Sequence, residues 1–179
     1  MSITHISKLL PEMRIKIYEL KRICMHEEID ILCYCGLRTC ADQARLYRQS
    51  RTSHEINQKK QSLTDKGFPF LAAVIDEVGP QAGTTGKHVT KAGPGESWHQ
   101  YALAADCVPV VGGKAVWDAD DPRWEFYGQA AIHLGMVWAG QWPGFKEMPH
   151  VQLYTASNPL QEFRGPDIVK DRLREAKSL

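Results

Sequence analysis

Apolar residues recur at helical spacing near the start of the chain. Within residues 7–27 the apolar positions are separated by steps of four, three and four residues, which places them on one face of a helix. These positions are Met13, Ile17, Leu20 and Cys24. Residues 29–37 (IDILCYCGL) are rich in strand-favouring side chains, and residues 41–51 (ADQARLYRQSR) return to helical spacing. The first part of the chain is therefore predicted to form a helix, a strand and a second helix.

A hairpin is predicted in the second half of the chain. Residues 104–111 (AADCVPVV) form an apolar run of strand length, and Gly112-Gly113 follows as a turn signal. Residues 115–117 can then return as the second strand of the hairpin.

A helix follows the hairpin. Asp121 next to Pro122 is typical of a helix start, because Asp caps free N–H groups and Pro fits the first turn. We expect this helix over residues 122–134, ending at Gly135. Further expected elements are short strands at residues 136–138 and 150–153 and a closing helix at residues 166–177.

A polar insertion lies between the two halves, at about residues 48–85. Its first part, residues 48–66, is basic with scarcely any apolar pattern, so it is predicted to be a loop, an insertion or an exposed helix extension. Residues 79–95 are rich in glycine and are predicted to be a long loop, which in a compact domain usually serves a function.

The composition describes a protein with its own hydrophobic core. The 179 residues include 22 Lys and Arg against 21 Asp and Glu, for a formal net charge of +1, and 43% are hydrophobic. This length is typical of one domain, or at most two very small ones, and the composition excludes a disordered tail protein. The net charge offers no overall field for nucleic acid or an anionic membrane. The longest apolar stretches, such as residues 68–75, are far shorter than the roughly 20 residues of a membrane-spanning helix. We expect a single domain over residues 1–179, with no nucleic-acid partner and no membrane insertion.

The N-terminal sequence and the cysteine content indicate a reducing compartment. The N-terminal residues lack the apolar segment and cleavage site of a secretory signal, so we expect the protein to accumulate in the cytoplasm. Five cysteines, an odd number, favour reduced thiols. The spacing of Cys33, Cys35 and Cys40 resembles a zinc knuckle only loosely, because the first two alternate within a predicted strand.

Three residues could form a metal site. His99 and Asp106 lie seven residues apart at a loop-to-strand junction, and His150 begins another short strand. Two imidazoles and a carboxylate are a normal ligand set for zinc, and three protein ligands leave a fourth position for water. An open position of this kind indicates catalysis. By spacing alone this is a weak signal.

The sequence around these residues resembles that of a known family. Ser97-x-His99-x6-Asp106 together with Glu147-x-x-His150 is similar to the zinc signature of the LAS group of metallopeptidases, which includes D-Ala-D-Ala peptidases and the zinc domain of sonic hedgehog. Within that group the chain most resembles phage and bacillar L-alanyl-D-glutamate peptidases. The resemblance covers most of the chain, and its other blocks are Gly36-Leu37-Arg38-Thr39, Gln43, Leu46-Tyr47, Leu134-Gly135, Trp138 and Pro149-His150-Val151-Gln152.

The resemblance implies a division of roles. It makes His99, Asp106 and His150 the ligands of Zn²⁺ and Glu147 the general base that takes a proton from water. It makes Arg38 the partner of zinc in stabilising the oxyanion of the scissile carbonyl. Ser97 and Gln43 are candidates for hydrogen bonds to the peptide substrate, although each could equally be a cap or a helix-surface residue.

Two features of the motif carry expectations about the backbone, namely the spacing of Glu147 and His150 and the residue at position 102. A straight strand would place Glu147 and His150 on opposite faces, so we expect a bend before Pro149. The family usually has glycine where this chain has Ala102, and Ala lacks the freedom of Gly at positive φ. The tryptophans are interpreted as core and cleft-wall residues rather than as a sugar-stacking stripe.

We therefore expect an α+β fold in which a small antiparallel sheet carries the zinc site and packs against helices, as in the hedgehog and D,D-peptidase group. The expected function is zinc-dependent hydrolysis of an amide in the peptide stem of bacterial peptidoglycan, most specifically the L-Ala to D-Glu bond. The expected setting is a monomeric phage endolysin that reaches the wall after release from the cytoplasm. The alternatives are a D-alanyl-D-alanine carboxypeptidase or dipeptidase of the same fold, and a zinc-containing binding module without turnover.

Overall fold

The computed structural model describes residues 3–79 and 87–179, which form two compact units. Unit 1 contains the residues up to Leu37 and Ala102–Thr155, and unit 2 contains Arg38–Tyr101 and Ala156–Leu179. The chain passes repeatedly from one unit to the other, so neither is a continuous stretch of sequence. The expectation of a single peptidase domain over the whole chain stays a prediction.

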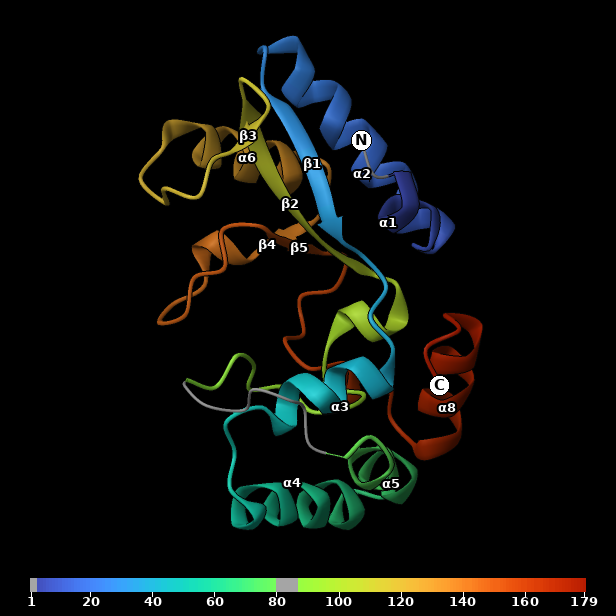
Figure 1. Cartoon of the computed structure of the whole chain (residues 1–179). Helices are drawn as coiled ribbons and strands as arrows, with labels where there is room; N and C mark the ends of the chain where they lie inside the picture. Colours follow the sequence, from blue (N-terminus) through green and yellow to red (C-terminus); the bar gives the residue numbers. More distant parts are fainter. Residues whose placement is uncertain (1–2, 80–86) are drawn as a thin grey trace. The chain divides into compact units, whose positions relative to one another are not determined.

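Unit 1 is built on a small antiparallel sheet. Its strand order is β1-β2-β5-β4, with β3 paired to β2 beside this path (Figure 1). The strands are β1 Asp30–Cys35, β2 Ala104–Val111, β3 Lys114–Ala115, β4 Val137–Trp138 and β5 His150–Gln152. The predicted hairpin, the strand near residue 30 and the two short later strands are all confirmed. The α+β prediction is confirmed as well.

Helices of unit 1 pack on the sheet and on each other. They are α1 Ile3–Ser7, α2 Pro11–His26, α6 Pro122–His133 and the 3₁₀ helix η2 Ala139–Gln141. The four predicted apolar positions of α2 are all buried, and they join residues of β1, β2 and α6 in one core. The predicted start of α6 is confirmed, because the Asp121 side chain accepts a hydrogen bond from the backbone N–H of Arg123. The helix predicted from residues 7–27 is α2, and it begins at Pro11 rather than at residue 7, since proline fits the first turn.

The two faces of the sheet have different roles. Cys33 of β1 lies opposite Cys107 of β2, and both side chains are buried in the core. Side chains alternate between faces along a strand, so Asp106 points to the other face. A bulge between Cys33 and Cys35 makes Cys35 the register partner of Asp106 and leaves Tyr34 as the extra residue. The face away from the core therefore carries the candidate site.

Unit 2 is helical in its described residues. Its elements are α3 Cys40–Arg48, α4 Ser53–Asp65, α5 Pro69–Glu77, the 3₁₀ helix η1 Trp98–Tyr101, α7 Pro159–Glu162 and α8 Pro166–Glu175. The predicted second and closing helices correspond to α3 and α8. Helix α5 packs against α3 and α4, and α8 packs against η1.

The polar insertion contains two helices. Most of residues 48–66 form α4, which is a helix of its own and not an extension of the helix before it, because α3 ends at Arg48 and α4 begins at Ser53. A capping box at Thr52 and Glu55 begins it, and the buried Ile56 and Leu63 anchor it. The long loop predicted for residues 79–95 falls partly on 80–86, which lie outside the described residues.

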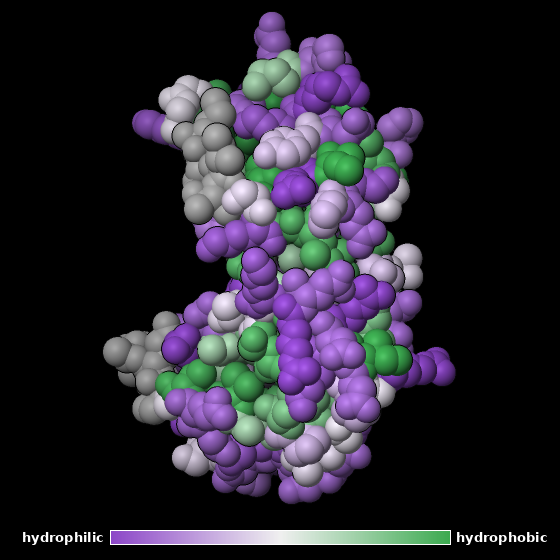
Figure 2. Space-filling model, turned by 90° about the vertical axis from the view of Figure 1, so that its right-hand side faces the viewer, coloured by the Kyte–Doolittle hydropathy of each residue, from purple (hydrophilic) through white to green (hydrophobic). Residues whose placement is uncertain are grey.

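The described helices include none long and apolar enough to cross a membrane. On the face of the molecule shown in Figure 2, hydrophobic residues are interspersed with hydrophilic ones.

Trp138 is enclosed by two glycines, and this contact yields a prediction. A Cβ atom at Gly128 of α6 would lie 2.0 Å from the Trp138 ring, and one at Gly140 would lie 2.2 Å from it. We expect Gly128→Ala to lower the free energy of unfolding by about 1–3 kcal/mol, because the buried ring must move. Urea denaturation checks this value. In a Gly128→Ala/Trp138→Phe double variant the smaller ring should make the two losses less than additive, and full additivity would contradict the proposed clash.

Burial of Cys24 yields a second prediction, for alkaline pH. Burial in the core raises the pKa of this thiol from 9.0 to about 11. The unfolded chain therefore loses this proton at a lower pH than the folded chain, so stability is fully present below pH 9 and falls as the pH rises toward 11. Urea midpoints measured across this range should fall more steeply for the wild type than for Cys24→Ala. Equal slopes would mean that the thiol has the same pKa in the folded and unfolded states, which would contradict the effect of burial.

Candidate functional site

Asp106 and His150 form the centre of the site in unit 1. They are register partners on the neighbouring strands β2 and β5, and His150 Nδ1 lies 3.0 Å from Asp106 Oδ1. Two candidate ligands far apart in the sequence are thereby brought together by strand pairing. Both side chains are largely buried: His150 is 9% exposed and Asp106 is 15% exposed. Water therefore does little to screen their interaction.

Gln152 fixes the state of the His150 ring. Its amide nitrogen donates to the carbonyl of Tyr154 at 2.5 Å, which turns the amide oxygen toward His150 Nε2 at 3.0 Å. An amide oxygen only accepts, so Nε2 carries the proton and the lone pair of Nδ1 faces Asp106. An imidazole lone pair and a carboxylate 3.0 Å apart need a cation, either a proton or a metal ion. The donor set therefore fits zinc, and Gln152 is a contributor that motif spacing alone did not reveal.

Glu147 and His150 belong to one tight turn. The backbone N–H of His150 donates to the carbonyl of Glu147 at 3.1 Å, with Met148 and Pro149 between them. This turn is the bend expected before Pro149. It lets two residues three apart, which a straight strand would separate, leave the chain on one side.

Two buried aromatic side chains hold this turn in place. Trp138 Nε1 donates to the carbonyl of Met148 at 2.8 Å, and the Tyr127 hydroxyl donates to that of Pro149 at 2.8 Å. The backbone N–H of Cys107 also donates to the Pro149 carbonyl. Burial raises the pKa of Tyr127 well above its usual value, so its hydroxyl remains a donor. The core of unit 1 thus positions the segment that carries Glu147.

Negative charge gathers at this side of the sheet. The Tyr34 phenol has a raised pKa, first because of burial and then because of the negative charges of Asp106 and other groups, including Glu147. Glu147 itself is exposed. An exposed carboxylate in the turn that leads into His150 has access both to solvent and to a bound substrate, as a general base requires.

Unit 2 holds the remaining candidate residues. His99 lies in η1, and its carbonyl accepts a hydrogen bond from the backbone N–H of Arg38 at 3.2 Å. The Arg38 guanidinium donates to Gln43 Oε1 at 3.0 Å. Gln43 is fully buried, and its amide nitrogen donates to the carbonyl of Ala92 at 2.7 Å and to Thr90 Oγ1 at 3.2 Å. The structure therefore joins Gln43 to Arg38 as a support for the guanidinium.

The start of η1 is held by polar contacts. The carbonyl of Ser97 accepts from the backbone N–H of Gln100, so the predicted substrate-binding serine begins this helix, and its side chain is half-buried. The buried Glu96 beside it is paired with Lys59 of α4 at 2.6 Å. The position of Ser97 is thus set by neighbours on both sides.

Ala102 adopts the conformation that glycine favours. Its φ is +55°, within the left-handed region, and its side chain is fully buried. The turn after η1 therefore forms with alanine in the place where the family pattern has glycine. A left-handed alanine costs about 1–2 kcal/mol relative to its usual conformation.

The five cysteines are free thiols, as their odd number indicated. None of the five is in a disulfide, Cys33 faces the core of unit 1, and Cys40 belongs to unit 2. Burial raises the pKa of the Cys40 thiol, which contacts the Ser178 hydroxyl at 3.5 Å.

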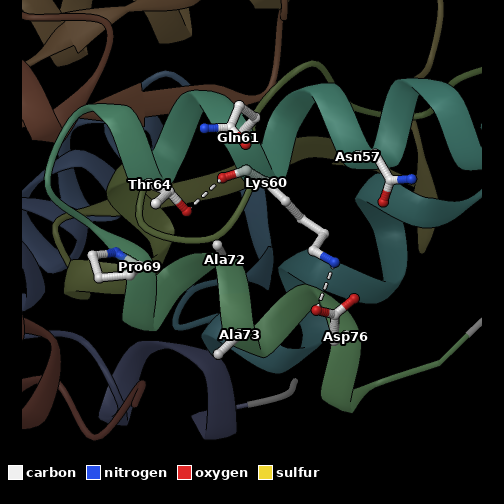
Figure 3. Close-up of a pocket in the computed structure, with 8 residues that line it drawn as sticks. All are labelled: Asn57, Lys60, Gln61, Thr64, Pro69, Ala72, Ala73 and Asp76. Atoms are coloured by element: carbon white, nitrogen blue, oxygen red, sulfur yellow. Dashed lines mark hydrogen bonds and ion pairs between the residues drawn. The ribbon is translucent and has the colours of Figure 1, made fainter.

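A separate groove opens between α4 and α5. It has a volume of about 440 Å³, and Lys60 reaches across it to an ion pair with Asp76 at 2.7 Å (Figure 3). The other side chains that line it are Asn57, Gln61, Thr64, Pro69, Ala72 and Ala73. Figure 3 shows that Ala72 and Ala73 come from α5 and that Thr64 bonds back to the carbonyl of Lys60. The sequence-predicted site residues are not among those lining this groove.

Comparisons with known proteins agree with the resemblance found in the sequence. Residues 90–153 match the family described as D-alanyl-D-alanine carboxypeptidase, and this range includes His99, Asp106, Glu147 and His150. The peptidoglycan L-alanyl-D-glutamate endopeptidase CwlK of Bacillus subtilis (strain 168) is 28% identical over 142 residues, which cover 75% of this chain and 66% of the relative. The aligned part of the chain thus spans just under two thirds of that relative's length.

Two solved structures are similar at 14% identity. The L-Ala D-Glu endopeptidase ChiX of Serratia marcescens has a TM-score of 0.43, covering 90% of this chain and 88% of that one. The vancomycin resistance D,D-pentapeptidase VanY, in complex with Zn(II), has a TM-score of 0.47, covering 94% and 83%.

Proposed function

We propose that the protein is a zinc peptidase that hydrolyses an amide bond in the peptide stem of peptidoglycan, and the match of residues 90–153 to the family described as D-alanyl-D-alanine carboxypeptidase supports this proposal. The observation that carries the proposal is the Asp106–His150 pair, 3.0 Å apart, with Glu147 in the turn that leads into His150. We assign Zn²⁺ to His99, Asp106 and His150. The bond we propose is L-Ala to D-Glu, which is supported by the similarity to CwlK.

The chain's own residues supply most of the proposed mechanism. A bound zinc ion would act as a Lewis acid toward the scissile carbonyl and lower the pKa of water. Glu147 takes the proton of the attacking water and returns it to the leaving amine. Arg38, held by Gln43, donates hydrogen bonds to the oxyanion that develops on the carbonyl. Gln152 keeps the Nδ1 lone pair of His150 available for the metal.

The substrate and the bond are tested together by product analysis. Zinc-loaded protein is incubated with isolated peptidoglycan, and the fragments are identified by mass and by their new termini. Free N-terminal D-Glu, with L-Ala left on the glycan, is the expected result. Released D-Ala would replace this proposal with the carboxypeptidase or dipeptidase alternative. No cleavage by protein that has bound zinc would favour a binding module without turnover.

The role of Gln152 gives a prediction about metal affinity. We expect Gln152→Leu to weaken zinc binding about 10–100-fold, because His150 loses the acceptor that fixes its tautomer. A competition titration with a chromophoric chelator measures the affinity directly. Gln152→Glu, which keeps an acceptor oxygen, should lose less than Gln152→Leu. Equal affinities of Gln152→Leu and the wild type would contradict the role of this contact.

The biological setting is also a proposal. The resemblance to phage peptidases supports an endolysin that accumulates in the cytoplasm as a monomer and acts on the wall after release. Expression in a host cell tests this: lysis should require permeabilisation of the membrane, and light scattering of the purified protein should give the mass of one chain. Lysis without permeabilisation, or the mass of a dimer, would contradict it.

A further inference from the structure

Trp117 and Tyr34 form an exposed aromatic pair on unit 1. Their ring centroids are 5.5 Å apart at an angle of 71°, and the side chains are 63% and 37% exposed. By contrast, Trp98, Trp124 and Trp138 are each at most 3% exposed and confirm the interpretation of tryptophans as core residues. Trp117, which follows β3, has no such role in packing. Large aromatic rings left at a surface are typical of binding sites.

The pair lies next to the candidate catalytic residues. Tyr34 is the extra residue of the bulge in β1, and the residue after it, Cys35, is the register partner of Asp106. Bulges often occur beside active sites, where they redirect a side chain. Cys33 faces the core, and side chains alternate along a strand, so Tyr34 lies on the same face of the sheet as Asp106. The pair therefore lies on the face of the sheet that carries the Asp106–His150 pair.

Charge around the pair selects for an uncharged ligand. Trp117 is followed directly by the exposed Asp118 and by the exposed Asp120. These two carboxylates disfavour an acidic ligand at the aromatic pair itself. A sugar ring is uncharged, and the weakly positive C–H groups on its face fit against the negative face of an aromatic ring.

We propose that Trp117 and Tyr34 bind the sugar ring to which the peptide stem is attached. This inference rests on the proposed function, because L-Ala joins the stem to the lactyl group of that sugar. Cleavage between L-Ala and D-Glu then leaves only one amino acid between the scissile bond and the sugar. Trp117 supplies the exposed face for stacking, and Tyr34 holds the indole in place through its edge-to-face contact.

The test compares two substrates that differ only in the sugar. One is a soluble disaccharide-tripeptide from peptidoglycan, and the other is the same tripeptide with an acetyl group in place of the sugar. The measured quantity is the ratio of kcat/KM for the first to kcat/KM for the second. We expect Trp117→Ala to lower this ratio about tenfold, through KM, as truncation of an aromatic binding residue commonly does. Trp117→Phe, which keeps a ring, should restore part of it.

A matched control removes an exposed apolar side chain elsewhere in unit 1. Ile15 of α2 is 61% exposed, close to the value for Trp117, so Ile15→Ala should keep the wild-type ratio. A ratio that is unchanged in Trp117→Ala, with both substrates cleaved, would overturn the proposal. A merely structural role of Trp117 would lower both rates and leave the ratio as it is.

A binding measurement separates this inference from the proposed function. Tryptophan fluorescence of the wild type is titrated with the disaccharide alone, and a saturable change that is absent in Trp117→Ala is expected. If the wild type cleaves neither substrate but shows this change, the peptidase proposal fails and the sugar site stands. If it cleaves peptidoglycan but shows no change that depends on Trp117, the sugar site fails and the peptidase proposal stands.

Discussion

Glu147→Gln is expected to lower kcat on peptidoglycan about a thousandfold while zinc remains bound. Glutamine keeps nearly the same shape but cannot take the proton of the attacking water, and general-base catalysis typically contributes 10²–10⁴-fold. Glu147 is not one of the proposed ligands, and its backbone carbonyl, which closes the turn to His150, is unaffected by the substitution. Rates are measured by the release of soluble fragments from labelled peptidoglycan, and bound zinc by atomic absorption after gel filtration.

The control for Glu147 is a second exposed glutamate of unit 1. Glu125 lies on α6, where its carboxylate accepts a hydrogen bond from Gln129. Glu125→Gln removes the same charge and should leave the rate within about twofold, since a surface substitution of this kind has little effect. A Glu147→Gln variant that retains zinc and cleaves at the wild-type rate would remove Glu147 from the mechanism.

His150→Ala is expected to abolish cleavage and to weaken zinc binding by at least about a hundredfold. Loss of a ligand should exceed the 10–100-fold effect of changing a residue that only orients one. It also leaves the Asp106 carboxylate largely buried without the imidazole that lies 3.0 Å away. Chelator competition gives the affinity, and circular dichroism shows whether the variant is folded.

The control for His150 is a histidine of the same unit outside the site. His133 is exposed at the end of α6, so His133→Ala should bind zinc and cleave peptidoglycan like the wild type. A folded His150→Ala variant with wild-type zinc affinity would exclude His150 as a ligand. Loss of zinc in both variants would place a ligand outside the proposed set.

Local patterns in the sequence were enough to predict most elements of unit 1. The apolar spacing of α2 follows from burial on one side of a helix, and the cap of α6 depends only on Asp121 and its immediate neighbours. Helix α4 was harder to predict, because its buried apolar anchors are only Ile56 and Leu63 in a polar sequence. The local capping box at Thr52 begins the helix, and packing against α5, which no local pattern encodes, stabilises it.

The candidate site also combines features that the local sequence determines with features that depend on tertiary packing. By itself the sequence determined which residue types were available and in what order, because the motifs of His99, Asp106, Glu147 and His150 are local in the chain. Only the tertiary structure decided which partners those residues have within each unit. Strand pairing places Asp106 against His150, packing of α6 on the sheet brings Tyr127 to the Glu147–His150 turn, and the bulge in β1 makes Cys35 the register partner of Asp106. Such contacts join residues distant in sequence, and their free energy arises only when the sheet and helices pack together.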